Sequence, residues 1–231
     1  MTPEPSERRV YPRTGDNVPS RHPERARYDT ETIESILDGG LVGHLGFVVD
    51  GRPRVLPMLY VRSGDRLYLH GSTGARFNRM AARRKGGLEV CFEVTLFDAF
   101  VLARSTFNHS VNYRSVVVAG RAEVVSDPAR KKELLEALVE KLVPGRSTDA
   151  RGPSEMELRQ TGVLQLPLED VSAKLREGDP SDEPEDLTLP CWAGLLPLEC
   201  RFGSPLSSSD LSSEIELPGY LARLGGSPAV H

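Results

Sequence analysis

Residues 41–70, LVGHLGFVVDGRPRVLPMLYVRSGDRLYLH, decide the fold. They contain three short apolar runs with the composition of β-strands, at 41–49, 53–61 and 66–70. Asp50-Gly51 separates the first two runs, and this dipeptide is a strong signal for a tight hairpin turn. Ser63-Gly64-Asp65 supplies a second turn. The stretch therefore predicts a meander of three antiparallel strands.

Other segments outside this meander also have strand character. They are rich in apolar residues and bounded by turn residues: 88–95, 97–105, 113–125, 162–175 and 191–200. Strands joined by tight turns favour an antiparallel sheet, and the lack of a regular strand–helix–strand alternation disfavours a doubly wound fold. A sheet of about seven short strands tends to close into a barrel, because closure removes its exposed edges.

Helices are predicted between the strands. Asp29 is an N-cap for the first, whose apolar residues recur at helical spacing up to Gly39-Gly40. Residues 75–85 form a second helix, Asp127-Pro128 begins a third, and a short helix at 153–161 starts at a capping serine. The predicted fold class is β (α+β): a small antiparallel β-barrel with peripheral helices.

The two ends of the chain differ in composition from its middle. Residues 1–27 contain five prolines and almost no large apolar side chains, so we expect a flexible N-terminal arm. The barrel domain is expected over residues 28–203. Residues 204–231 are rich in Ser, Gly and Pro and are expected to form a weakly ordered C-terminal tail.

Composition excludes several classes of function. A net charge of -4 with 6% aromatic residues argues against nucleic-acid binding. No apolar run approaches the roughly 20 residues that span a bilayer, so a membrane partner is not expected. The N-terminus lacks the apolar segment of a secretory signal, and three cysteines without paired spacing argue against disulfides and structural zinc. We therefore expect a cytoplasmic protein without a metal site.

The segment 67–77, LYLHGSTGARF, has the pattern of an anion site. A strand ends at His70, a short loop follows, and a helix begins near Ala75. Backbone N–H groups at a helix start, together with the helix dipole, favour bound anions. Ser72 and Thr73 add hydroxyl donors, and the guanidinium of Arg76 suits phosphate. Arg79 and Arg83 share the helix face with Arg76, where a solvated basic surface is the alternative interpretation.

Two further stretches carry polar groups on apolar strands. The strand that follows HSVN opens with Tyr113, Arg114 and Ser115, and alternation places Arg114 on the face opposite the other two. Pro57 interrupts the 53–61 strand, which removes a ladder donor and frees nearby backbone groups. Such free groups suit a planar heterocycle on a barrel wall, although a simple bulge would explain Pro57 equally well.

The order of LYLHGSTGARF (67–77), HSVNYRSVVVAGRAEVV (109–125), SAKLR (172–176) and WAGLLPL (192–198) resembles the flavin-nucleotide-binding split-barrel proteins. These belong to the pyridoxamine 5'-phosphate oxidase-like superfamily, in the branch that includes nitroimidazole-resistance proteins. The resemblance covers about residues 25–200. It implies a six-stranded split barrel that forms a homodimer, with FMN held in two clefts between the subunits.

The resemblance also implies site residues. Cofactor-binding roles fall on Leu56, Pro57, Met58, Leu59, His70, Ser72, Thr73, Arg76, Asn112, Tyr113, Arg114, Ser115, Lys174 and Trp192. The 53–61 strand would line the flavin ring, and the 71–76 loop would hold the phosphate. His70 is the candidate catalytic residue, able to orient a substrate or pass a proton. Simple packing is its alternative role. His44 and His109 have no ligand partners at useful spacing and are interpreted as structural or loop residues.

The resemblance implies an FMN-dependent oxidoreductase that acts on a small molecule, similar to a nitroreductase or to pyridoxamine phosphate oxidase. The protein would set the position and surroundings of the flavin, and the flavin would carry the redox chemistry. One alternative is a non-catalytic flavin-binding protein for storage or sensing. Another is a split-barrel relative that uses deazaflavin or haem.

Overall fold

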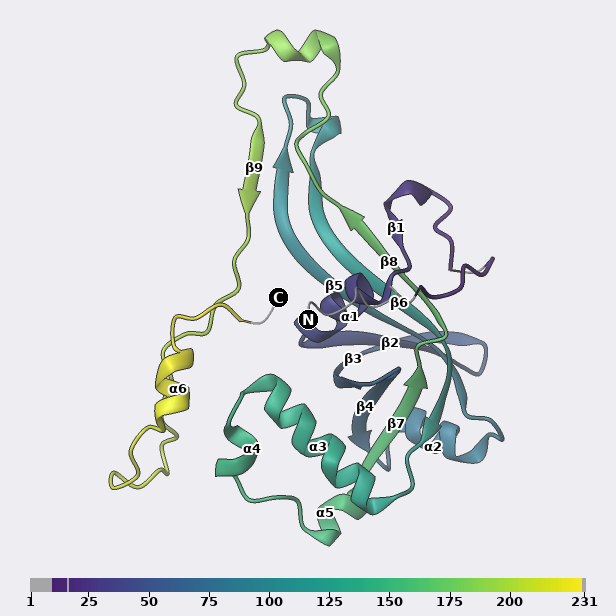
Figure 1. The fold of residues 1–231 in the computed structure, drawn as a ribbon, viewed down its shortest axis with the longest axis vertical. Helices are drawn as coiled ribbons and strands as arrows, with labels where there is room; N and C mark the ends of the chain where they lie inside the picture. The colour runs from purple at the N-terminus through teal and green to yellow at the C-terminus, as the bar shows by residue number, and fades with distance from the viewer. Residues whose placement is uncertain (1–9, 16, 230–231) are drawn as a thin grey trace, which may run out of the picture.

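The computed structural model describes residues 10–15 and 17–229 of the chain. In this part, nine strands form one antiparallel sheet, confirming the predicted fold class. Figure 1 shows a barrel from which the long strands β5 and β6 project. The strands are β1 (Ala26–Arg27), β2 (Val42–Val49), β3 (Arg52–Ser63), β4 (Arg66–Ser72), β5 (Leu88–Leu102), β6 (Ser110–Val124), β7 (Thr161–Pro167), β8 (Asp170–Arg176) and β9 (Gly194–Pro197).

The barrel closes because β6 has partners on both of its edges. The sheet order is β1-β8-β6-β7-β4-β3-β2-β5-β9, and β5 also pairs with β6. Six strands, β2 to β7, therefore form a ring. On its other edge β6 changes partner along its length: Tyr113–Ala119 pair with β8, and only Glu123 and Val124 pair with β7. This change of partner splits the barrel wall.

The described residues form six α-helices and three short 3-10 helices, and Figure 1 shows α6 apart from the barrel. Asp29 and Asp127 accept backbone hydrogen bonds as N-caps, and Ser154 forms a capping box, so all three predicted starts are confirmed. The helices are α1 (Thr30–Gly39), α2 (Arg76–Arg83), α3 (Pro128–Leu142), α4 (Arg146–Asp149), α5 (Glu155–Gln160), α6 (Gly219–Leu224), η1 (Pro23–Arg25), η2 (Thr106–Asn108) and η3 (Pro184–Thr188).

Four predicted strands differ from the observed ones. The segments 88–95 and 97–105 are one strand, β5, which continues through a register shift between Phe97 and Ala99. The 162–175 segment is two strands, because the chain leaves β7 at Pro167 and enters β8 at Asp170. The 191–200 segment keeps only the four residues of β9, which pair with β5 alone.

The core has two parts. The larger fills the barrel and includes the fully buried Leu45, Leu69 and Phe92. The smaller lies between α3 and the outer face of β3, β4 and β7, where Leu134 and Leu138 pack on Tyr68. The apolar stripe predicted for this helix therefore packs on the barrel wall.

The described part of the predicted N-terminal arm lies on the barrel. Tyr11 is buried, and the Thr14 hydroxyl donates to Asp170 at 2.8 Å. Strand β1 pairs with β8, opposite Lys174 and Ala173. Residues 1–9 and 16 of the arm, and 230–231 of the tail, lie outside the described residues. The domain limits at 27/28 and 203/204 stay a prediction.

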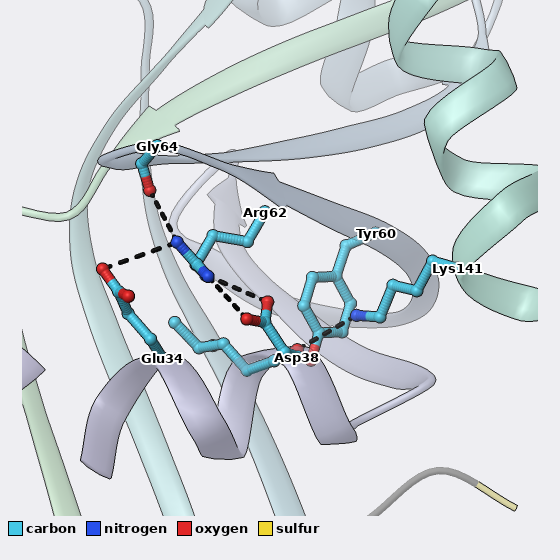
Figure 2. Close-up of polar contacts among 7 residues, drawn as sticks. Glu34, Asp38, Tyr60, Arg62, Gly64 and Lys141 are labelled. Carbon is cyan, nitrogen blue, oxygen red and sulfur yellow. Dashed lines mark hydrogen bonds and ion pairs between the residues drawn. The ribbon is translucent and has the colours of Figure 1, made fainter. Parts of the chain in front are cut away.

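A buried lysine connects α1 to α3, as Figure 2 shows. The ammonium of Lys141 lies 3.7 Å from the centre of the Tyr60 ring and donates to the Leu37 carbonyl at 3.0 Å. Tyr60 donates to the same carbonyl at 2.6 Å. Arg62 forms ion pairs with Asp38 and Glu34 beside this contact. The end of α1 is thus fixed to both β3 and α3.

Burial lowers the pKa of Lys141 to about 8, from an ordinary value of 10.5. Between these two pH values, the unfolded chain therefore binds more protons at Lys141 than the folded chain does. The contribution of Lys141 to the free energy of unfolding rises with pH over this range. We expect the difference in unfolding free energy between the wild type and Lys141→Met to grow by about 2 kcal/mol from pH 7 to pH 10. Denaturant unfolding at several pH values measures it, and a difference that stays flat would contradict the assignment.

Candidate functional site

The turn from β4 into α2 is held by hydrogen bonds across the chain. Thr73 donates its backbone N–H and its hydroxyl to the Gln160 carbonyl, at 2.9 and 3.1 Å. Gly74 donates to the Ser72 hydroxyl at 3.1 Å, and Ala75 donates to the Ser72 carbonyl at 3.0 Å. These contacts fix the loop on which the sequence predicted an anion site. We call residues 71–76 the corner loop.

The start of α2 has unused donors. Its N-cap, Ala75, makes no side-chain cap, and the first helical bond comes from Arg79. In the described part of the chain, the backbone N–H groups of Arg76, Phe77 and Asn78 have no hydrogen-bond acceptor. The Arg76 side chain is exposed and has no ion-pair partner among those residues. Three N–H groups and a guanidinium at one corner are a set of donors that would suit a phosphate.

Two glycines let α2 pack against the end of β4. A Cβ at Gly71 would lie 2.7 Å from the Phe77 ring, which is buried in the core. A Cβ at Gly162 would lie 2.4 Å from the Asn78 amide. That amide is buried and donates to the Ser72 carbonyl at 2.8 Å. The close approach of helix and strand therefore sets the shape of the corner loop.

His70 lies just before the corner loop, on β4 opposite Val163. Its Nδ1 is buried without a hydrogen-bond partner, and burial lowers the pKa of the imidazole below its ordinary value of 6.5. The ring is therefore neutral at pH 7. An unpaired polar atom in a half-buried ring is costly, and such atoms concentrate at functional sites.

The predicted flavin-lining strand has an open edge. β3 pairs with β2 over Arg52–Leu59 and with β4 only over Tyr60–Ser63. The β4-facing edge of Leu56, Pro57, Met58 and Leu59 thus has no described strand partner. Pro57 stays in register opposite His44, so it makes no bulge. The open edge adjoins the end of β4 and offers free backbone groups to a planar ligand.

The remaining predicted residues form a second group around β6 and β8. Asn112 is buried and bonds to Arg176 and to the Gly178 carbonyl. Arg114 makes a bidentate ion pair with Asp98, which raises the pKa of the guanidinium.

Other members of this group use polar atoms within the chain. The Ser115 hydroxyl donates to the Lys174 carbonyl at 3.3 Å, and the Lys174 ammonium donates to the Arg21 carbonyl at 3.0 Å. Tyr113 is half-buried at the start of the ladder with β8. Trp192 is 68% exposed and precedes β9 instead of lying in it.

The predicted residues fall on two parts of the ring. Ser115 lies nine residues before Val124, the residue of β6 that reaches β7 and, through Leu164, the middle of β4. At about 3.3 Å a residue this is roughly 30 Å of strand between Ser115 and that point. Round the other side of the ring, β2 and β5 lie between β3 and β6, which separates them by about 15 Å. We call the residues on β3, β4 and α2 one half-site, and those on β6, β8 and the segment before β9 the other.

Sequence reasoning missed a feature of His109. Its Nδ1 lies 2.9 Å from the Ser105 carbonyl, an arrangement that holds the ring and leaves Nε2 free. Phe107, 91% exposed, is two residues away at the tip of the β5–β6 hairpin. The pairing of Phe107 with His109 in this segment was the available signal, although spacing alone could not separate it from a loop.

Two kinds of feature are absent from the described residues. Within residues 10–15 and 17–229, no three His, Cys, Asp or Glu side chains gather as a group that could hold a metal ion. Over the same ranges, no helix is both long and apolar enough to cross a membrane.

A closed six-stranded ring whose wall is split where β6 changes partner is the architecture of a split-barrel protein. A family model described as pyridoxamine 5'-phosphate oxidase matches residues 29–175. The chain belongs to this family, which confirms the resemblance found in its sequence. A search of curated proteins found no match.

Several solved structures are similar to this chain. The flavocytochrome Anf3 from Azotobacter vinelandii is 34% identical over 93% of this chain and 98% of its own, with a TM-score of 0.83. A FAD and haem binding protein from Mycobacterium smegmatis is 33% identical over 90% and 100%, with a TM-score of 0.82. A 5-nitroimidazole antibiotic resistance protein from Bacteroides thetaiotaomicron, so described provisionally, is 23% identical over 65% and 86%, with a TM-score of 0.54. This last likeness bears on the fold alone.

Because the pKa of His70 is lowered in the folded chain, we expect this residue to make the free energy of unfolding depend on pH. The folded chain takes up the proton of this imidazole less readily than the unfolded chain does, so protonation below pH 6.5 favours unfolding. In His70→Gln this contribution is absent. We expect the stability of the wild type relative to the variant to fall from pH 7 to pH 5 in urea titrations. A pH-independent difference would mean that the ring is solvated.

Proposed function

We propose that this chain is a flavin-dependent redox protein that also carries haem, with FAD as its flavin. The sequence led us to expect FMN. FAD replaces it because one of the two nearly full-length relatives is described as binding FAD and haem, and the other as a flavocytochrome. Both cover at least 90% of this chain.

The observation that carries the flavin assignment is the corner loop. Three unused backbone N–H groups and the unpaired Arg76 are donors that a flavin phosphate needs. No described side chain neutralises or caps them. A phosphate bound there would remove the cost of leaving these donors without acceptors.

The ring of the flavin would lie along the open edge of β3. Leu56, 39% exposed, supplies apolar surface there. Met58 is buried in the barrel core and would contribute only backbone groups, and Pro57 limits the donors on this strand. His70 lies next to this edge with a neutral imidazole. We assign to His70 the orientation of the substrate or a proton transfer beside the ring. The proposed reaction class is electron or hydride transfer to a small molecule.

The second half-site would come from another copy of the chain. The outward face of β2, β3 and β6 carries exposed apolar residues that no part of the described chain covers, including Val42 (45% exposed), Val55 (64%) and Val117 (39%). Gly46 and Ala119 lie on the same face, and their small size keeps it flat. A homodimer would cover it and bring the β6 half-site of one chain to the corner loop of the other.

Haem is assigned to the hairpin end of the molecule. The family model ends at residue 175, whereas the two flavocytochrome-type relatives match nearly the whole chain. Residues after 175 pack on the hairpin, where Asp182 pairs with Arg104 at 2.7 Å. His109 lies there with Nδ1 held and Nε2 free, and Phe107 and Trp192 offer exposed aromatic surface. His109 is thus the residue that would hold the haem iron.

A flavin, when bound, would supply two-electron and one-electron redox chemistry, and a haem would supply a one-electron centre. The chain would hold the phosphate through Arg76 and the start of α2, support the ring on β3, and keep a neutral imidazole at its side.

Purified protein tests the two cofactors together. We expect flavin absorbance bands, a haem Soret band, and a co-purified ligand with the mass of FAD. His109→Ala should lose the Soret band and keep the flavin. Protein saturated with FAD and haem that oxidises no reductant would instead favour a non-catalytic binding protein. A ligand with the mass of a deazaflavin would overturn the flavin assignment.

Arg76→Ala tests the corner loop. Loss of a charge-assisted hydrogen bond to phosphate should weaken flavin binding by about tenfold or more, measured by quenching of flavin fluorescence. Arg66→Ala is the control, because Arg66 lies at the other end of β4 beside Asp65. Equal affinities for the wild type and Arg76→Ala would place the phosphate elsewhere.

A further inference from the structure

A basic groove runs from the corner loop along α2. Its volume is about 400 Å³, and it lies between α2 and the β2–β3 turn. Its lining is Val49, Asp50, Arg76, Arg79, Met80, Arg83 and Arg84. We call it the arginine groove. Arg76 belongs to both the corner loop and the groove, so the two are continuous.

The cations of this groove are not neutralised by the protein. Arg76, Arg79, Arg83 and Arg84 are all exposed, and none has an ion pair or side-chain hydrogen bond among the described residues. Most other arginines of the barrel do have such partners, for example Arg62 and Arg114. Four like charges around one hollow repel each other, and this repulsion makes the groove a site for a polyanion.

The groove also has surfaces that suit a nucleoside. Val49 is buried at its floor, and Met80 is half-buried beside it. An adenine ring can lie on such an apolar floor, with a guanidinium stacked on its other face. Asp50 lies on the rim with a left-handed backbone (φ 50°), and its carboxylate can accept hydrogen bonds from ribose hydroxyls.

We propose that the arginine groove holds the adenosine monophosphate half of FAD. The inference rests on the proposed function, since it begins at the flavin phosphate bound to the corner loop. The second phosphate would then follow Arg76 toward Arg79 and Arg83, and the adenosine would lie over Val49 and Met80. FMN has only the first phosphate and would leave the groove empty. The groove would therefore make the chain select FAD over FMN.

The double variant Arg79→Ala/Arg83→Ala tests the groove while Arg76 stays in place. Apoprotein of the full chain is titrated with FAD and with FMN, and quenching of flavin fluorescence gives both affinities. We expect FAD affinity to fall by about tenfold or more and FMN affinity to change less than about twofold, because only FAD has a phosphate beyond the corner loop. Arg66→Ala, which removes one exposed cation outside the groove, should alter neither.

Competition on the wild type gives a second measurement that does not depend on a variant folding. AMP should displace FAD and leave FMN bound, since AMP and FMN would occupy different parts of the site. Unchanged FAD affinity in the double variant, or equal wild-type affinities for the two flavins, would overturn the proposal. Weakening of both flavins by the same factor would show only a long-range charge effect, and would also overturn it. Failure of the wild type to bind either flavin would instead refute the proposed function.

Discussion

Closure of the barrel by β5 and β6 is the constraint on which the rest of the structure depends. Thirteen residue pairs join these two strands, and this ladder completes the ring of six. Closure pairs nearly every edge of the wall. Within the described chain, the edge of β3 beside Leu56–Leu59 remains open. The corner loop lies next to this edge. β4, which leads into the loop, is held in place because it pairs with β7 along its whole length. The candidate site is therefore where the closed wall is incomplete.

The same region is where the chain gives up local stability. His70 Nδ1 has no partner, α2 begins without a side-chain cap, and the arginines along the helix have no counter-charges. Several comparable groups elsewhere are satisfied: Asp29 caps α1, and Lys141 reaches the Leu37 carbonyl. Unsatisfied donors gathered at one corner, beside an open edge, suggest that a ligand completes the fold there.

Much of this architecture is readable from sequence, because local chemistry specifies it. Asp50-Gly51 fixes the first hairpin, and Asp127-Pro128 fixes the start of α3. Strand ends were less predictable: β5 runs through a register shift at Phe97 because its long ladder with β6 continues on both sides. The candidate residues were found through family resemblance. Their separation into two half-sites follows from the register of β6, which no single-sequence pattern encodes.

The N-terminal segment has a practical consequence for anyone who modifies this chain. Residues 26 and 27 are the only described strand on the outer edge of β8, and Asn17 and Arg21 add contacts to the same strand. Trimming the chain back to the first helix would uncover that edge, which could then template pairing between molecules. Fusion partners and cleavage sites are therefore best placed before Val10.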